Sequence, residues 1–368
     1  MAQVSTNAGS QPPHQVSTPR SASTTTSLPS VALLVGGMLA VAALALVLAT
    51  RAPLATTVLG LILFGVLHNV LEIRYVAGRF APVLSGRFLG LLLALITGIV
   101  ICRLLTAYWP SGARQAEIML GFVVLAVGGV FGLRTLPGTR SLRGGLIVSG
   151  ILTLLAAGAI ASLAFPAYYF VVLTHLHNLV PLVFLWEWAR RIPHRGARTA
   201  FRLTQVLWIV LLPLVILAGA LDRYVADGPG VVQRFVGSGS AVISSATPPA
   251  LLDQLGLRFL VVFAFMQTMH YVVWVGFLPR FGADATASFE ARVPWLRGRR
   301  AWALGLGGGA VLAAVFVSDY VQGKAIYAAL ASYHAYLEFP VLLALLMAPA
   351  LVRGRPIPAD AVRPASPR

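Results

Sequence analysis

Long apolar runs, most of them free of charge, recur along most of this chain and constrain its fold more than any other feature. An α-helix needs about 20 apolar residues to cross the hydrocarbon core of a membrane, and the runs have that length. They are continuously apolar and do not alternate with polar residues, which favours helices over membrane strands. The expected fold class is therefore all-α, a polytopic integral membrane helical bundle of about ten transmembrane helices.

Ten spans are expected, most of them joined by short loops. A single tight turn at Pro166 separates the fifth from the sixth, and residues 222–255 form the longest loop. The spans cover approximately residues 31–50, 53–75, 84–106, 115–134, 144–165, 167–189, 201–221, 256–278, 301–319 and 326–351.

Three regions follow from this pattern. Residues 1–29 are rich in Ser, Thr, Pro and Gln and predict a disordered N-terminal tail. Residues 30–352 predict a single transmembrane helical domain, and residues 353–368 predict a basic cytoplasmic C-terminal tail. No second, soluble domain is expected.

The basic charge of the chain indicates membrane topology and not nucleic-acid binding. The formal net charge is +17, but the arginines lie in short loops between apolar runs. Most of the 28 Lys and Arg residues fall on the side that carries both termini. Because positive loops stay in the cytoplasm, we expect a multi-pass protein of the cell membrane with cytoplasmic N- and C-termini.

Two rare residues exclude other classes. Lys324 is the only lysine and lies at a helix mouth, so no helix interior offers an amine for a retinal Schiff base, and an opsin is excluded. Cys102 is the only cysteine, so neither an internal disulfide nor a cysteine-based zinc or iron–sulfur site is possible.

Five histidines lie inside the expected spans: His68, His175, His177, His270 and His334. Ionisable side chains are costly in hydrocarbon and usually face a bundle interior where they serve a function. The spans that carry them, the second, sixth, eighth and tenth, run in the same direction across the membrane. All five are therefore predicted metal ligands that converge near mid-membrane.

Two glutamates share helix faces with these histidines. His68 and Glu72 are four residues apart, as are His334 and Glu338, which places each pair on one face. A carboxylate can bind a metal or hold the second ring nitrogen of a histidine ligand, so Glu72 and Glu338 are predicted catalytic residues. The alternative is an interfacial Glu72–Arg74 charge pair with His68 as a polar core residue.

The sixth span carries two histidines that cannot both face one site on a regular helix. His175 and His177 are about 200° apart around the helix axis. Pro181 removes the backbone hydrogen bond to the carbonyl of His177, so a kink is expected there. One of the two is expected to be a ligand and the other to hydrogen-bond nearby.

The donor types narrow the cofactor but leave it open. Imidazole with carboxylate suits iron, zinc, copper or nickel. Three or four histidines with open positions suit Fe(2+) and O2 chemistry, whereas two opposed histidines suit haem b. Aromatic residues beside the histidines are candidate substrate-binding residues, or else ordinary interfacial and core aromatics: Tyr271, Trp274, Tyr333 and Tyr336.

The segment Leu67-His68-Asn69-Val70-Leu71-Glu72 resembles an early span of the Brp/Blh family of membrane-bound bacterial β-carotene 15,15′-dioxygenases. That family has Pro-His-Gly, two small or apolar residues, then Asp. Asn69 stands here for the Gly, Leu67 for the Pro and Glu72 for the Asp. The resemblance implies a helical bundle whose histidines hold one non-haem iron and cleave β-carotene with O2 into two retinals.

The same resemblance implies a ligand set. His68 would be the first ligand, His175 or His177 the mid-chain ligand, and His270 a later one. Trp274 stands where the family has a further histidine, so His334 would supply the fourth ligand from another span.

Three functions fit the sequence. The first is an integral-membrane non-haem iron oxygenase that takes O2 and a long apolar, lipid-soluble substrate from membrane lipid. The second is a haem b redox protein that uses the histidines in axial pairs. The third is a transporter with a His/Glu proton or metal relay, which would spread the polar residues over the membrane depth.

Overall fold

The computed structural model describes residues 28–134, 142–226, 228, 230–249, 251 and 253–347. Every regular element within these ranges is helical, which confirms the all-α fold class. The expected N-terminal tail, except for residues 28 and 29, and the whole expected C-terminal tail lie outside the described residues.

Eight helical segments of the described chain are long and apolar enough to cross a membrane, so the chain is a multi-pass membrane protein. They coincide with the first four expected spans and with the sixth to the ninth. A shorter apolar helix, Val148–Ala164, falls in the fifth. The eight segments are Val31–Arg51, Pro53–Arg79, Gly86–Leu105, Pro110–Gly132, Pro166–Arg191, Arg195–Leu217, Gln254–Phe281 and Arg299–Ser318.

The principal helices follow the expected spans closely, and the tenth span corresponds to α16. Their bounds are α1 Leu28–Arg51, α2 Pro53–Arg79, α3 Gly86–Leu105, α4 Pro110–Arg134, α5 Leu142–Ala164, α6 Pro166–Leu179, α7 Pro181–Trp188, α8 Arg195–Val206, α9 Leu212–Leu217, α12 Gln254–Tyr271, α13 Leu278–Phe281, α15 Arg299–Ser318 and α16 Tyr320–Met347. Short helices lie in the loops: α10 Gln233–Val236, α11 Ser240–Ala246 and α14 Ala287–Arg292.

Two prolines and two π-helical turns interrupt the helices. Pro166 begins α6, and a single residue, Phe165, separates it from the end of α5, in agreement with the tight turn that the sequence predicts. The predicted break at Pro181 is also present, because α6 ends at Leu179 and α7 begins at the proline. Residues Leu207–Leu211 and Val272–Phe277 form π-helical turns, a conformation frequent at functional sites.

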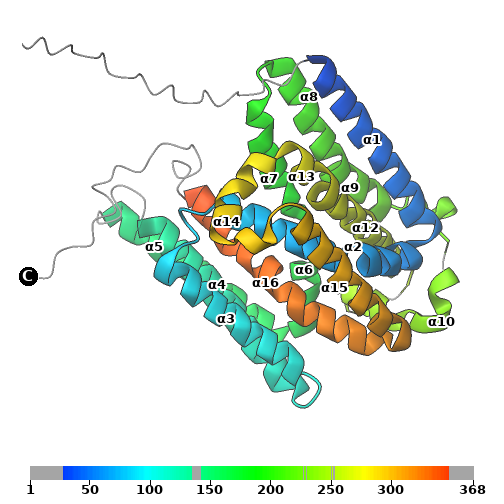
Figure 1. Ribbon diagram of the computed structural model, residues 1–368. Helices are drawn as coiled ribbons and strands as arrows, with labels where there is room; N and C mark the ends of the chain where they lie inside the picture. The colour runs from blue at the N-terminus through cyan, green and yellow to red at the C-terminus, as the bar shows by residue number, and fades with distance from the viewer. Residues whose placement is uncertain are drawn as a thin grey trace, which may run out of the picture.

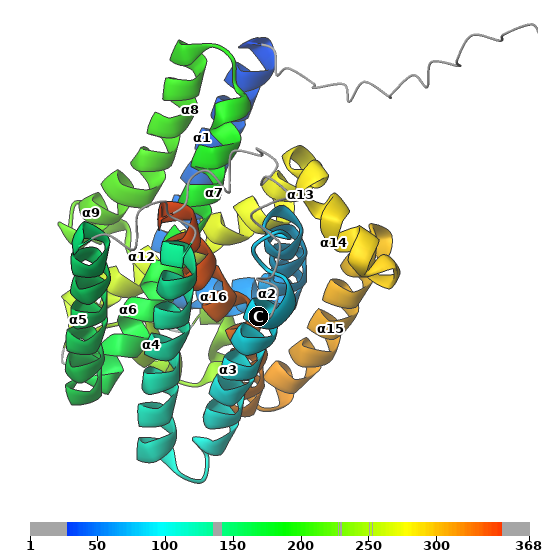
Figure 2. The same ribbon diagram turned by 90° about the vertical axis from the view of Figure 1, so that its left-hand side faces the viewer.

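The helices form a central group flanked by two others (Figures 1 and 2). Helices α3, α4 and α5 form a row on one side of the molecule, and α16 packs against α3 and α4. On the other side α1 packs against α8 and α12. Between them α2 contacts α12, α15 and α16. The central helices α2, α6, α12 and α16 are those that carry the predicted histidines.

One end of the bundle is joined by ion pairs. Arg74 at the end of α2 pairs with Glu290 of α14, and Arg79 pairs with Glu187 of α7. Arg191 donates two hydrogen bonds of 2.8 Å to the carboxylate of Asp284 in the loop before α14. These bonds hold the pKa of the Asp284 carboxyl below its usual range. The loops after α2, α7 and α13 therefore lie together at this end.

Glycines allow the closest helix contacts. A methyl group added at Gly128 of α4 would lie 2.5 Å from Cβ and 2.6 Å from Cα of Pro340 in α16. At Gly90 of α3 an added methyl group meets nothing within 4 Å. Helix α4 therefore approaches α16 closely only because residue 128 has no side chain.

We expect Gly128→Ala to destabilise the fold and Gly90→Ala to leave it unchanged or slightly more stable. Alanine improves helix propensity by about 1 kcal/mol at either position. Overpacking against the backbone of Pro340 opposes this gain with about 1–3 kcal/mol. Thermal unfolding in detergent measures the difference. Equal melting temperatures for the two variants would show that α4 and α16 do not pack as described.

Candidate metal centre

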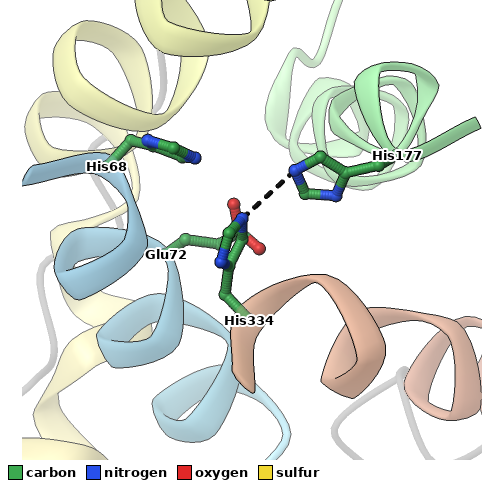
Figure 3. Close-up of side chains that lie close together, drawn as sticks. All are labelled: His68, Glu72, His177 and His334. Carbon is green, nitrogen blue, oxygen red and sulfur yellow. Dashed lines mark hydrogen bonds between the residues drawn. The ribbon is translucent and has the colours of Figure 1, made fainter. Parts of the chain in front are cut away.

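Four side chains from three helices converge at the centre of the bundle (Figure 3). His68 and Glu72 come from α2, His177 from α6 and His334 from α16. One ligand atom of each lies within 4.8 Å of the others. The i, i+4 spacing brings His68 and Glu72 to the same face of α2, as predicted.

His68 has one ring nitrogen committed to the backbone. Its Nδ1 lies 3.0 Å from the carbonyl oxygen of Phe64. A carbonyl only accepts hydrogen bonds, so Nδ1 carries the proton. Nε2 of the neutral ring therefore keeps its lone pair, which is the form that binds a metal.

His177 is oriented in the same way by a carboxylate. Its Nδ1 lies 2.8 Å from Oε2 of Glu338, so an Nδ1–H donates to the carboxylate and Nε2 keeps a lone pair. A carboxylate that holds the second nitrogen of a histidine fixes the ring and raises its basicity as a ligand. Glu338 thus positions His177, one of the two roles that the sequence predicts for it.

The ring nitrogens of His177 and His334 face each other. The two Nε2 atoms are 3.2 Å apart (Figure 3). Two ligands of a tetrahedral metal with bonds of about 2.0–2.1 Å lie about 3.3 Å apart. The spacing of these nitrogens is therefore that of two ligands of one metal ion.

Glu72 is fully buried, and neither of its oxygens has a hydrogen-bond partner among the described residues. Arg74, two residues later, pairs with Glu290. The alternative of a Glu72–Arg74 pair is therefore wrong. A buried carboxylate without a donor is unfavourable by several kcal/mol, and a bound cation would supply the missing partner.

His270 lies beside the four donors. Its Nε2 is 3.6 Å from Oε2 of Glu72, and its ring centroid is 4.5 Å from that of His177 and 5.2 Å from that of His68. Neither ring nitrogen has a hydrogen-bond partner within the described chain. His270 therefore borders the cluster through Glu72, two residues before the π-helical turn of Val272–Phe277 begins.

His175 is placed outside the cluster, in contrast to its inclusion in the predicted ligand set. Its Nε2 lies 2.8 Å from the carbonyl oxygen of Ala246 in α11, and its ring packs against Phe259 and Phe263. Because α6 stays helical through both histidines, the separation of about 200° turns His175 away when His177 faces the donors. The expectation that only one of the two faces the site is met.

The four aromatic candidates occupy different surroundings. The Tyr271 ring packs 4.7 Å from that of His68, and its hydroxyl accepts a hydrogen bond from Gln267.

Trp274 is fully buried in the core against Tyr75 and Phe184. Tyr333 lies within hydrogen-bonding distance, 3.0 Å, of Thr97. Only Tyr336 of the four lines the cavity described next.

A cavity of about 660 Å³ lies between α4, α5, α6 and α16. Its lining includes the exposed side chains of Phe165, Val172 and Leu176, so it opens on the apolar outer surface. The full lining is Gly121, Phe122, Val124, Leu125, Ala161, Ser162, Phe165, Tyr168, Tyr169, Val172, Leu173, Leu176, Tyr336 and Phe339.

The cavity follows the face of α6 that carries His177. Tyr169 and Leu173 line it, and His177 continues the same row at the next i+4 position. The His177 side chain is 16% exposed, whereas His68, Glu72 and His334 are at most 2% exposed. The donor cluster is therefore least shielded at His177, at the end of this row.

A buried ion pair beside the cavity has no role in the functions predicted from the sequence. Arg103 of α3 donates from Nε to Oε1 of Glu117 in α4 at 2.8 Å, and the Tyr336 hydroxyl donates to the same oxygen at 2.9 Å. The sequence does place one charged residue inside each of two expected spans, Arg103 in the third and Glu117 in the fourth. Charged residues inside spans usually pair across helices, so this ion pair could have been predicted.

Comparison of the chain with protein families, curated proteins and solved structures finds no match.

We expect the purified protein to hold about one divalent metal ion per chain, because the four donors form one compact set. His177→Ala and His334→Ala should each remove most of this metal. His175→Ala is the matched control from the same helix and should retain it. Metal analysis of protein purified in detergent measures all three. Full occupancy of His334→Ala, or loss in His175→Ala alone, would contradict the assigned donors.

Glu338→Leu should weaken metal affinity by about 10–100-fold, the usual effect of removing the hydrogen-bond partner of a ligand. Glu338→Gln keeps an acceptor for the Nδ1–H of His177 and should lose less. Competition with a chelator measures both affinities. Equal losses in the two variants would show that Glu338 acts through its charge and not through the orientation of His177.

Proposed function

We propose that the chain is an integral-membrane, metal-dependent oxygenase that uses O2 to cleave or oxidise a long apolar substrate. The observation that carries this proposal is the compact His68–Glu72–His177–His334 cluster beside an apolar cavity that opens on the outer surface. Three imidazoles and one carboxylate suit non-haem Fe(2+), our proposed cofactor.

The packing of the histidines favours a single metal ion over haem b. The ring centroids of His68, His177, His270 and His334 lie 4.5 to 5.2 Å from their neighbours. A porphyrin would have to lie flat between two axial rings. Rings packed against each other at these distances leave no space for it, so haem b is the weaker alternative.

The convergence of the donors also favours a site over a relay. A proton or metal path needs polar groups at successive depths along the membrane. Here the four ligand atoms lie within 4.8 Å of one another, and Glu338 and His270 contact members of the same cluster. A transporter remains the second alternative.

The residues of the cluster and those of the cavity would have separate roles. His68, His177, His334 and Glu72 would hold the metal, and the Phe64 carbonyl and Glu338 fix the two histidines that they contact. The apolar cavity would exclude water and admit substrate from lipid. Bound Fe(2+) would supply the redox chemistry with O2. Cleavage of a carbon–carbon double bond by O2 into two carbonyl products balances without an external reductant.

A carotenoid such as β-carotene is the proposed substrate class, with retinal as the product if the double bond cleaved is the central one. The support is the resemblance of residues 67–72 to the Brp/Blh family and the position of His68 and Glu72 in the cluster. His177, and not His175, would take the part of the mid-chain ligand.

We also propose that the protein lies in the cell membrane with both termini in the cytoplasm. In the ten-span topology the loops after α2, α7 and α13 lie on the side that carries both termini. Ion pairs bring these loops together at one end of the bundle, which supports the assignment.

Purified protein in lipid nanodiscs, loaded with Fe(2+) and supplied with β-carotene, should bleach the polyene absorption only when O2 is present. His68→Ala and His177→Ala should lower the rate by more than about 100-fold, because loss of a ligand exceeds loss of its hydrogen-bond partner. His175→Ala should stay close to wild type. With ¹⁸O2, both carbonyl products should carry the label.

Bleaching that persists without metal would contradict the oxygenase. A Soret band would favour the haem b alternative. Absence of turnover, together with proton or metal flux in proteoliposomes, would favour the relay.

A further inference from the structure

The lining of the apolar cavity includes a pair of tyrosine hydroxyls that the proposed chemistry does not use. The Tyr169 hydroxyl lies 3.4 Å from the Tyr336 hydroxyl, and both residues line the cavity. Tyr336 in turn contacts Glu117, which Arg103 binds at 2.7 Å through Nη2 and 2.8 Å through Nε. A chain of hydrogen bonds therefore runs from the cavity to a buried ion pair.

The direction of these bonds is fixed by the carboxylate. Oε1 of Glu117 accepts from Arg103 and from the Tyr336 hydroxyl, so the Tyr336 proton points to Glu117. The Tyr336 oxygen can then only accept from Tyr169, so the Tyr169 proton points to Tyr336. The Tyr169 oxygen is left with lone pairs and no proton for a ligand.

We propose that the cavity binds an elongated apolar molecule that bears a hydroxyl group at one end, with this hydroxyl donating to the Tyr169 oxygen. A ketone at the same position could only accept, and the proton order offers it no donor. The inference deepens the proposed function, because it names the substrate class of the same site.

The position of the Tyr169 hydroxyl depends on Gly121 of α4. A methyl group added at Gly121 would lie 2.4 Å from the Tyr169 hydroxyl oxygen and 3.2 Å from the Tyr336 ring. The absence of a side chain at residue 121 therefore leaves the space that the Tyr169 hydroxyl occupies.

Two other hydroxyls line the cavity. Tyr168 donates its hydroxyl proton to the carbonyl oxygen of Pro249 at 3.1 Å, away from Glu117. Ser162 of α5 also lines the cavity. Among the described residues, neither hydroxyl hydrogen-bonds to the Arg103–Glu117 pair, so Tyr168→Phe and Ser162→Ala are matched controls for Tyr169→Phe.

The test is equilibrium binding of three polyenes to wild-type protein in nanodiscs under nitrogen. β-Carotene has no oxygen, β-cryptoxanthin adds one ring hydroxyl, and echinenone adds one ring ketone. One extra hydrogen bond should make β-cryptoxanthin bind about 3–10-fold more tightly than the other two. Tyr169→Phe and Gly121→Ala should abolish this preference, and both controls should keep it.

A second variant tests the proton order itself. Tyr336→Phe removes the acceptor that holds the Tyr169 proton, so this proton becomes free to reach a ligand. The affinity for echinenone should then rise relative to that for β-carotene.

Equal affinity of the three polyenes for wild type, no binding of any of them, or loss of the preference in Ser162→Ala instead of Tyr169→Phe would overturn the inference. Because binding is measured without O2, its outcome is separate from that of the oxygenase. If the protein prefers β-cryptoxanthin but cleaves no polyene, this inference stands and the proposed oxygenase function fails. If it cleaves a polyene but shows no such preference, the proposed function stands and this inference fails.

Discussion

The structure depends on one constraint, the burial of ionisable side chains inside an apolar bundle. Glu72 and Glu338 are fully buried, and three of the five intramembrane histidines are at most 2% exposed. Such groups are tolerated when they find partners. Glu338 accepts a hydrogen bond from His177, and His68 donates one to a backbone carbonyl. Glu72 has no hydrogen-bond donor within the described chain. A cation shared by the cluster would satisfy the members that remain.

Helix α16 connects this cluster with the rest of the molecule. It brings His334 and Glu338 to the candidate metal centre and Tyr336 to the cavity and the Arg103–Glu117 pair. Residues on two faces of the same helix therefore serve two polar centres. Because α4 approaches α16 at Gly128, the packing of α4 and α16 influences the position of both centres.

The regular helix α6 supports the same arrangement. Pro181 begins α7, and His177 lies in the last turn of α6 with its side chain toward the donors. The same face of α6 lines the cavity further back along the helix. A regular α6 that places His177 among the donors therefore also places the cavity beside it, and turns His175 toward α11.

The sequence by itself determined the membrane class, the helices and the candidate ligands. Apolar length decides whether a helix can span lipid, and a histidine or glutamate inside a span is visible in one dimension. It could not choose between His175 and His177, nor decide whether His270 joins the ligands or borders them. It also missed Arg103 with Glu117, and it left open whether Trp274 lines a substrate site or packs in the core, where the structure places its ring. These outcomes depend on how separate helices rotate and approach one another, which tertiary packing alone decides.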